Sequence, residues 1–285
     1  MTRSQADLLV LFAALIWGVA FYFQKIAMDH VGPLTFLGLR AAIASAALAP
    51  WAWQEQGRPA ADARPIWHYA VLAGLVFFTG GALQQTGLVT ATVTNTSFLT
   101  ALYVILTPFL LWMLKHEKPG LRVWIAAVMA FVGIWYLGGG SLAAFSKGDV
   151  LIAVSSLFWS LYMVVTGASA KAGRPRLYTC LHFAVIAALA LPLAFAFEDV
   201  SWAAIKAGAV PILYVGLIST AFTFTIMATA VRHIPASRAS VLLSTEVVFG
   251  AAAGYVMLGE RLPLVGWLGA GLVLAAIILV QMDRK

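Results

Sequence analysis

Residues 116–124, HEKPGLRVW, and residues 259–267, GERLPLVGW, carry one pattern at two points of the chain that lie 143 positions apart. In both stretches a Glu is followed seven residues later by a Trp, and long apolar segments flank the pattern on each side. Internal similarity at a fixed offset indicates a duplicated chain. We therefore expect two related halves, residues 1–140 and residues 141–285.

Further matches extend this correspondence in both directions. At the offset of 143, the corresponding pairs are Ser97 with Ser240, Leu99 with Leu242, Val104 with Val247, Glu117 with Glu260, Leu121 with Leu264, Ala127 with Ala270, and Ile134 with Ile277. At an offset of 142, the segment ALIWG matches the segment SLFWS, which pairs Trp17 with Trp159. Apolar segments share residues by chance, so an old duplication that now serves an enzyme or a scaffold stays open.

The composition indicates a membrane protein. Of the 285 residues, 62% are hydrophobic and only 10% are charged, whereas a soluble domain carries about 25% charged residues. A surface with so little charge is suited to lipid as its solvent. The net charge of +7 comes from basic residues scattered singly between apolar runs, so no nucleic acid is expected as a partner. Cys180 is the single cysteine, which excludes an intramolecular disulfide and a cysteine metal cluster.

Ten apolar segments are long enough, at about 20 residues, to cross a bilayer as helices. Short turns rich in Gly and Pro separate most of them. The predicted spans are 6–28, 32–54, 65–88, 92–114, 119–139, 148–168, 177–197, 208–231, 236–258 and 263–282. The expected fold is an all-α polytopic membrane protein with ten transmembrane helices and no soluble domain.

The Lys and Arg residues predict the orientation of these helices. With both termini in the cytoplasm, thirteen basic residues lie on the inside and four, Lys25, Lys147, Lys206 and Arg261, lie on the outside. This bias is typical of membrane proteins whose cytoplasmic loops are enriched in Lys and Arg. Each half then holds five helices, an odd number, so the second half enters the membrane from the opposite side. The sequence therefore predicts an inverted repeat, an arrangement found in many secondary transporters.

Four features together resemble the drug/metabolite transporter superfamily, specifically its EamA-type members. They are Leu-Ile-Trp-Gly at 15–18, Arg40, the HEKPG turn at 116–120 and the LGERLP turn at 258–263. Within that family, NTSFLTALYVILTP at 95–108 is most similar to the aromatic amino-acid exporters of the YddG type. The resemblance covers the whole chain. It implies ten helices in two five-helix repeats, alternating access through a central cavity, and export of metabolites such as amino acids across the bacterial inner membrane.

Several aromatic and polar residues are candidates for lining such a cavity. Trp17 with Phe21, and Trp159 with Met163, are four residues apart and share a helix face. Flat rings away from the membrane interface are suited to an aromatic substrate, although for any one ring simple packing remains an alternative. Gln84 can meet a polar end of the substrate or form an interhelical hydrogen bond. The predicted substrate contacts are Trp17, Phe21, Phe78, Gln84, Tyr103, Trp159, Met163, Phe222 and Ser244.

Two ionisable residues, Arg40 and Glu246, fall inside predicted spans. A charge in mid-membrane costs about 2.5–3.5 kcal/mol on insertion scales, so each should face a partner or water. Arg40 can bind a carboxylate or form a structural ion pair, and Glu246 can pair with a basic residue or carry a coupling proton. Tyr103 is the counterpart of Glu246 at the offset of 143, so the repeat does not supply a pair of carboxylates.

The chain lacks the motifs of the common enzyme classes. The five His residues are dispersed, and neither an HExxH zinc pair, a GxSxG elbow nor a phosphate-binding loop is present. We expect no enzyme activity, cofactor or metal, and the small-molecule substrate and the lipid bilayer as partners. A monomer is sufficient, and an oligomer stays open. The rival interpretations are a transporter of nucleosides, purines or cationic drugs and, more remotely, a membrane-embedded enzyme that acts on lipid.

Overall fold

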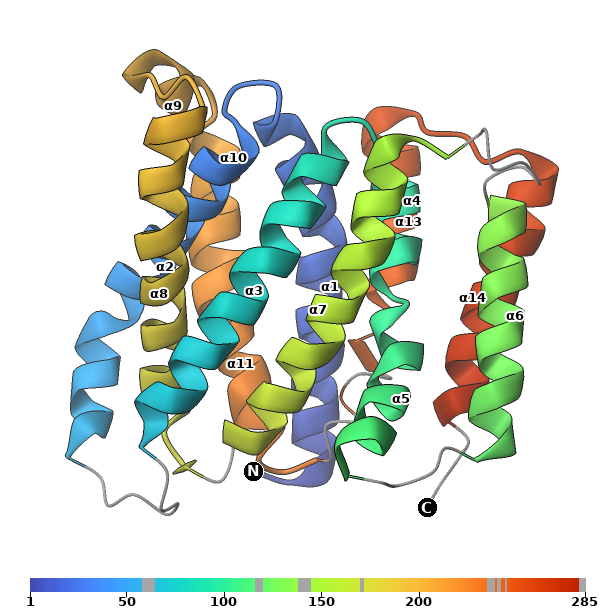
Figure 1. Cartoon of the computed structure of the whole chain (residues 1–285), viewed down its shortest axis with the longest axis horizontal. Helices are drawn as coiled ribbons and strands as arrows, with labels where there is room; N and C mark the ends of the chain where they lie inside the picture. Colours follow the sequence, from blue (N-terminus) through green and yellow to red (C-terminus); the bar gives the residue numbers. More distant parts are fainter. Residues whose placement is uncertain are drawn as a thin grey trace.

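The computed structural model describes residues 1–57, 65–115, 120–137, 145–169, 172–234, 239, 242–243 and 245–281, and within these ranges all regular structure is helical, without a strand. The helices run between two faces of the molecule, and α1 begins and α14 ends at the lower face of Figure 1. The first half contains α1 (Arg3–Ala27), α2 (Pro33–Gln56), α3 (Ile66–Leu88), α4 (Val93–Thr100), α5 (Tyr103–Lys115) and α6 (Leu121–Leu137). The second contains α7 (Lys147–Ser169), α8 (Pro175–Phe197), α9 (Trp202–Ala207), α10 (Ala209–Leu213), η3 (Tyr214–Phe222), α11 (Thr223–Ala230), α13 (Glu246–Leu258) and α14 (Leu264–Gln281).

Among the described residues, seven helices are long and apolar enough to cross a membrane. Their bounds are Arg3–Ala27, Pro33–Gln56, Ile66–Leu88, Val93–Leu114, Lys147–Ser169, Pro175–Phe197 and Ala209–Ala230. Three shorter apolar helices are Trp124–Gly133, Glu246–Leu258 and Leu264–Ala276. Helical structure thus occurs in all ten predicted segments, but ten membrane crossings require that the three shorter helices cross as well.

Three of the predicted continuous helices contain irregular backbone. A turn at Ala101 and Leu102 separates α4 from α5, and α13 begins at Glu246, directly after a turn at Thr245. Between α10 and α11 the chain forms the nine-residue π-helix η3. The predicted spans 92–114 and 208–231 nevertheless agree within one residue with the membrane-spanning stretches Val93–Leu114 and Ala209–Ala230. Hydrophobicity predicts where the chain is helical, but it does not report the local hydrogen-bond pattern.

Long-range packing brings the two halves together. α2 packs along α8 and α3 along α7, while α1 contacts α13, α11 and η3. The α1–α13 approach is very close, since a Cβ atom added to Gly18 would lie 2.5 Å from the Cβ of Phe249. A small residue at this crossing lets the two backbones approach, as at many membrane helix interfaces. α6 and α14 pair with each other at one end of the molecule (Figure 1).

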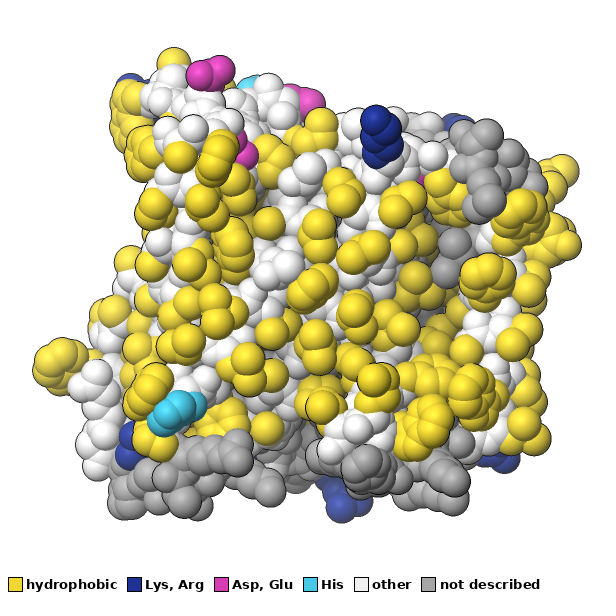
Figure 2. Space-filling view, viewed as in Figure 1, with side chains coloured by type: hydrophobic (Ala, Val, Ile, Leu, Met, Phe, Trp, Pro, Cys, Tyr) yellow, Lys and Arg dark blue, Asp and Glu magenta, His cyan; other side chains and the backbone are white. Residues whose placement is uncertain are grey.

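The outer surface is suited to lipid. On the face shown in Figure 2, hydrophobic side chains cover the middle, and the coloured acidic and basic side chains gather toward the upper and lower edges. Large apolar residues such as Trp53, Phe131, Phe197 and Leu264 are more than 70% exposed. A soluble protein would bury such side chains, so this surface is that of a membrane protein.

Several glutamate side chains accept hydrogen bonds from the first turn of a helix in the other half of the chain. The carboxylate of Glu198 accepts hydrogen bonds from the backbone N–H groups of Leu34 and Thr35 at the start of α2, both at 2.7 Å. Glu260 does the same at the start of α4, and Glu55 does so at the start of α8. A carboxylate at a helix N-terminus satisfies free N–H groups and interacts favourably with the helix dipole.

Glu260 caps a helix that is distant in sequence. It caps α4, where Thr94 lies 166 residues from it, and not the helix that follows it in the chain. The sequence indicates a capping carboxylate, whereas its partner depends on tertiary packing. Glu117 lies outside the described residues.

Candidate functional site

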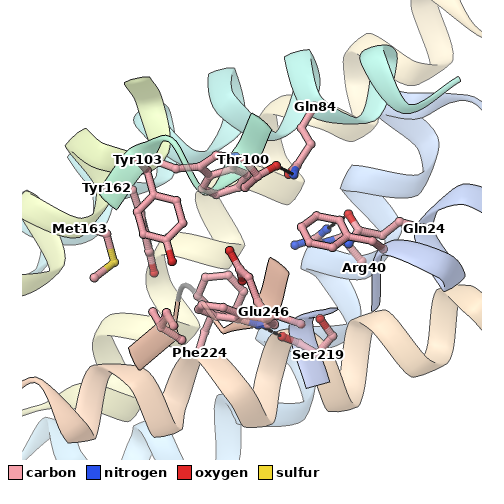
Figure 3. Close-up of a pocket in the computed structure, with 14 residues that line it drawn as sticks. Gln24, Arg40, Gln84, Thr100, Tyr103, Tyr162, Met163, Ser219, Phe224 and Glu246 are labelled. Carbon is pink, nitrogen blue, oxygen red and sulfur yellow. Dashed lines mark hydrogen bonds between the residues drawn. The ribbon is translucent and has the colours of Figure 1, made fainter. Parts of the chain in front are cut away.

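A pocket of about 580 Å³, including its part open to solvent, lies in the middle of the helices. Its walls come from α1, α2, α3, α4, α5, α7, η3, α11 and α13, so both halves of the chain contribute (Figure 3). The lining residues are Trp17, Phe21, Gln24, Arg40, Gln84, Thr100, Tyr103, Trp159, Tyr162, Met163, Ser219, Phe224, Leu243 and Glu246. A concave, mainly apolar cavity with a few polar groups is typical of a small-molecule site.

Aromatic rings form much of the wall. The rings of Trp17 and Phe224 lie 4.6 Å apart between centroids. Phe77, directly behind the pocket, contacts Trp159 edge-to-face at 4.7 Å and Tyr162 at 5.4 Å. These geometries are the ones that aromatic pairs prefer. The rings therefore hold each other in fixed orientations and present a preformed apolar surface to a ligand.

The two indole N–H groups of the pocket differ in their partners. Nε1 of Trp17 donates to the backbone carbonyl of Ser219 at 2.9 Å. Ser219 lies in η3, and π-helical turns occur frequently at functional sites because their altered hydrogen bonding redirects backbone groups. Nε1 of Trp159 is buried and has no hydrogen-bond partner among the described residues. A buried donor without a partner is costly, so it is available to a ligand or to water.

Arg40 brings a positive charge to the pocket wall. Its side chain is 5% exposed, and Nη1 donates to Oε1 of Gln24 at 3.2 Å. The guanidinium group lies 5.5 Å from the centroid of the Phe77 ring and 6.0 Å from that of Phe36. Among the described residues, Nε of Arg40 has no hydrogen-bond partner and no carboxylate forms an ion pair with the guanidinium group.

Glu246 and Tyr103 face each other across the pocket (Figure 3). Glu246 is 3% exposed and is the first residue of α13, as Tyr103 is the first residue of α5. The hydroxyl of Tyr103 is buried without a hydrogen bond of good geometry.

Corresponding residues of the two halves meet in this pocket. At offsets of 142 and 143 in sequence, the lining set contains four such pairs: Trp17 with Trp159, Phe21 with Met163, Thr100 with Leu243, and Tyr103 with Glu246. Residues matched by the sequence offset therefore line one cavity, although only the Trp pair keeps the same side chain.

Most predicted contacts lie around the pocket. Trp17, Phe21, Gln84, Tyr103, Trp159 and Met163 line it, together with Arg40 and Glu246. Gln84 also donates from Nε2 to Oγ1 of Thr100 at 2.9 Å, so the interhelical hydrogen bond considered for it is present as well.

Two predicted contacts do not line the pocket. Phe78 is partly buried in a neighbouring hydrophobic cluster, because it lies one residue and about 100° around the helix from Phe77. Phe222 is 49% exposed and packs against Phe12 on the outer surface, with 6.4 Å between ring centroids. Ser244 lies outside the described residues.

Six lining residues are absent from the predicted set: Gln24, Thr100, Tyr162, Ser219, Phe224 and Leu243. The position of Gln24 could have been predicted from helix periodicity. It lies seven residues after Trp17 and so falls on nearly the same helix face. Ser219 contributes a backbone carbonyl whose exposure depends on the π-helix, and a side-chain pattern does not report that.

The described residues show no cluster suited to a metal, since no three His, Cys, Asp or Glu side chains gather there. His182 is fully buried, and its ring contacts the carbonyl of Tyr178 at 3.0 Å and the hydroxyl of Tyr162 at 3.4 Å. Neither of these two partners is a carboxylate.

Comparison with known proteins identifies relatives over the full chain. The model of the EamA-like transporter family matches residues 4–139 and residues 146–282. An uncharacterized transporter of Archaeoglobus fulgidus is 30% identical over 98% of this chain and 87% of its own length. The uncharacterized transporter YwfM of Bacillus subtilis is 28% identical over 96% of this chain and 93% of its own. One solved crystal structure superposes with a TM-score of 0.73 at 17% identity and covers 99% of this chain and 98% of that one, a likeness of fold alone.

Proposed function

The chain belongs to the EamA-like transporter family and is a membrane transporter, and from this premise we propose that its cargo is an amino acid with a bulky apolar or aromatic side chain. The observation that carries the proposal is the central pocket, which combines aromatic walls with one buried guanidinium and one buried carboxyl group. An amino acid of this class has a flat or bulky apolar body and two opposite charges. Aromatic walls take up the body through area burial and stacking.

Transport proceeds by alternating access between two five-helix inverted repeats. The four corresponding pairs in the pocket support this mechanism, as does the match of the family model to each half separately. Substrate sites of inverted-repeat transporters lie between the repeats, near mid-membrane, where helices are interrupted. The turns before Tyr103 and Glu246 and the π-helix beside Trp17 are interruptions of this kind.

The proposed location is the bacterial inner membrane, with both termini in the cytoplasm and net movement outward as export. The excess of Lys and Arg on the side of the termini supports this orientation. Ten crossings are needed for it, which includes the three shorter apolar helices.

Counterflow in liposomes tests the cargo. Vesicles that contain the purified protein are loaded with unlabelled tryptophan, phenylalanine or leucine, and entry of the labelled amino acid is followed against empty vesicles. We expect transient accumulation for all three and none for aspartate or lysine. Absence of accumulation for every bulky apolar amino acid contradicts the proposal.

Glu246 favours a second candidate, a transporter of aromatic cations, because it is the one carboxyl group among the described residues of the pocket. A carboxylate beside aromatic rings is suited to an amine without a carboxylate of its own. Counterflow with an aromatic amine separates the candidates. Accumulation of the amine in preference to the amino acid favours the second.

A further inference from the structure

We propose that Arg40 binds the carboxylate of the substrate, so that the carboxylate, and not the amino group, is the charge that the site requires. The inference rests on the proposed function and names the group by which the amino acid is recognised. Aromatic amines that lack a carboxylate are then poor substrates, even though their rings fit the same walls.

The first support is the incomplete coordination of Arg40. A guanidinium group carries five N–H donors. In Arg40 one of them donates to Gln24. Within the described part of the chain, Nε has no partner and no carboxylate forms an ion pair with the guanidinium group. A buried charge without a counter-ion is unfavourable, so the site is completed by an anion that enters the pocket.

Lys25 shows how a structural cation in this protein is satisfied. Its ammonium donates to three backbone carbonyls at the end of α3, those of Leu88, Val89 and Ala91, at 2.8–3.0 Å. All three donors of Lys25 are thus used within the protein. Arg40, one helix away and more deeply placed, has a single oxygen partner. Lys25 is therefore a cation that stabilises the fold, whereas Arg40 keeps hydrogen-bond donors available for a ligand.

Neighbouring amides hold Arg40 in place without neutralising it. Oε1 of Gln24 accepts from Nη1 of Arg40 and also from Nε2 of Gln85. Both Gln side chains are buried, with 6% and 0% exposure. Since an amide carries no net charge, the positive charge of Arg40 remains uncompensated. The two amides fix the orientation of the planar group, which favours bidentate binding of a carboxylate through the remaining donors.

Arg40 lies close to the aromatic rings of the pocket. It lines the same pocket as Trp17 and Trp159 (Figure 3 labels Arg40 and Gln24 at one side). The ring of Phe77 lies behind both Arg40, at 5.5 Å, and Trp159, at 4.7 Å. A carboxylate on Arg40 therefore leaves the rest of the ligand beside the aromatic wall. Glu246 lies on a different wall and forms no ion pair with Arg40, so it does not occupy this place.

Competition in the counterflow assay tests the inference with defined probes. Tryptophan, tryptamine, which lacks the carboxylate, and indole-3-propionate, which lacks the amino group, compete with labelled tryptophan. For the unchanged protein we expect tryptamine to compete at least about tenfold more weakly than indole-3-propionate, because it cannot pair with a buried guanidinium. Equal competition by the two analogues, or stronger competition by tryptamine, overturns the inference without any variant.

Two variants of Arg40 sharpen the result. Arg40→Gln should weaken tryptophan binding by at least about tenfold and remove the preference for indole-3-propionate, and Arg40→Lys should retain part of that preference. Arg3→Gln makes the same change at an exposed residue. It should leave the strength of competition by tryptophan, tryptamine and indole-3-propionate unaltered. Analogue preference unchanged in Arg40→Gln overturns the inference. If tryptophan counterflow is normal but the preference is absent, this inference alone fails; if no bulky amino acid moves, the proposed function fails with it.

Discussion

Glu55 and Glu198 lie 143 residues apart, and each accepts backbone hydrogen bonds from the first turn of a helix in the other half of the chain. Glu198 binds the N–H of Thr35 at 2.7 Å, and Glu55 binds the N–H of Leu177, the residue that corresponds to Thr35 at the offset of 142, at 3.1 Å. α2 begins at the upper face of Figure 1 and α8 begins at the lower face. The same contact is therefore made twice in opposite directions, which supports the proposed inverted repeat.

Replacing either glutamate by Ala should destabilise the protein by a similar amount. Each change leaves N–H groups at a helix start without acceptors, which costs about 0.5–2 kcal/mol. In detergent, the melting temperature of Glu55→Ala and of Glu198→Ala should fall by a few degrees. Asp29→Ala, at an exposed residue, serves as the control and should melt as the parent does. An effect confined to one glutamate argues against equivalent roles.

The orientation can be read by cysteine labelling. In a Cys180→Ala background, Ser201→Cys and Gln56→Cys place single thiols at opposite faces of the molecule. Because the basic residues favour the cytoplasm for the face that carries Gln56, an impermeant maleimide should label Ser201→Cys in intact cells. It should label Gln56→Cys only after permeabilisation. Labelling of both thiols from outside would falsify the proposed topology.

The helix positions could be predicted from the sequence because the length of each apolar stretch determines them. Apolar stretches of about 20 residues bounded by Gly, Pro and charged residues predict helices, and α2 and α3 end within two residues of the predicted limits. The position of Trp17 and Trp159 in one pocket agrees with the predicted repeat and with helix periodicity.

The finer features depend on contacts between distant segments. The nine residues of η3 include no proline, yet the chain forms a π-helix there, and the backbone carbonyl of Ser219 accepts from Trp17 across 202 residues. Phe222 and Phe224 are the same residue type two positions apart, and only Phe224 lines the pocket. In a span that is apolar on all sides, hydrophobicity does not distinguish the inward face from the lipid face.

The two indole N–H groups offer a matched pair of substitutions. Trp17→Phe removes the hydrogen bond to Ser219 and should cost about 0.5–1.5 kcal/mol of stability. Trp159→Phe loses comparable packing but removes a donor without a partner among the described residues, so the melting temperature should fall less than in Trp17→Phe. If that donor serves the substrate, tryptophan affinity in counterflow should decrease several-fold in Trp159→Phe. Equal melting of the two variants contradicts the assignment of their partners.

Phe222 and Phe224, in the eighth apolar segment at 208–231, test which face of this helix contacts the substrate. Phe224 is 7% exposed and lies 4.6 Å from Trp17 between ring centroids, whereas Phe222 is 49% exposed on the outer surface. Replacing a Phe by Leu keeps an apolar side chain of similar bulk but loses the ring. Because aromatic pairs contribute about 0.5–1.5 kcal/mol, Phe224→Leu should raise the half-saturating tryptophan concentration by roughly two- to tenfold. Phe222→Leu should leave it unchanged, since its ring faces lipid. The reverse order of effects would place the substrate outside the central pocket.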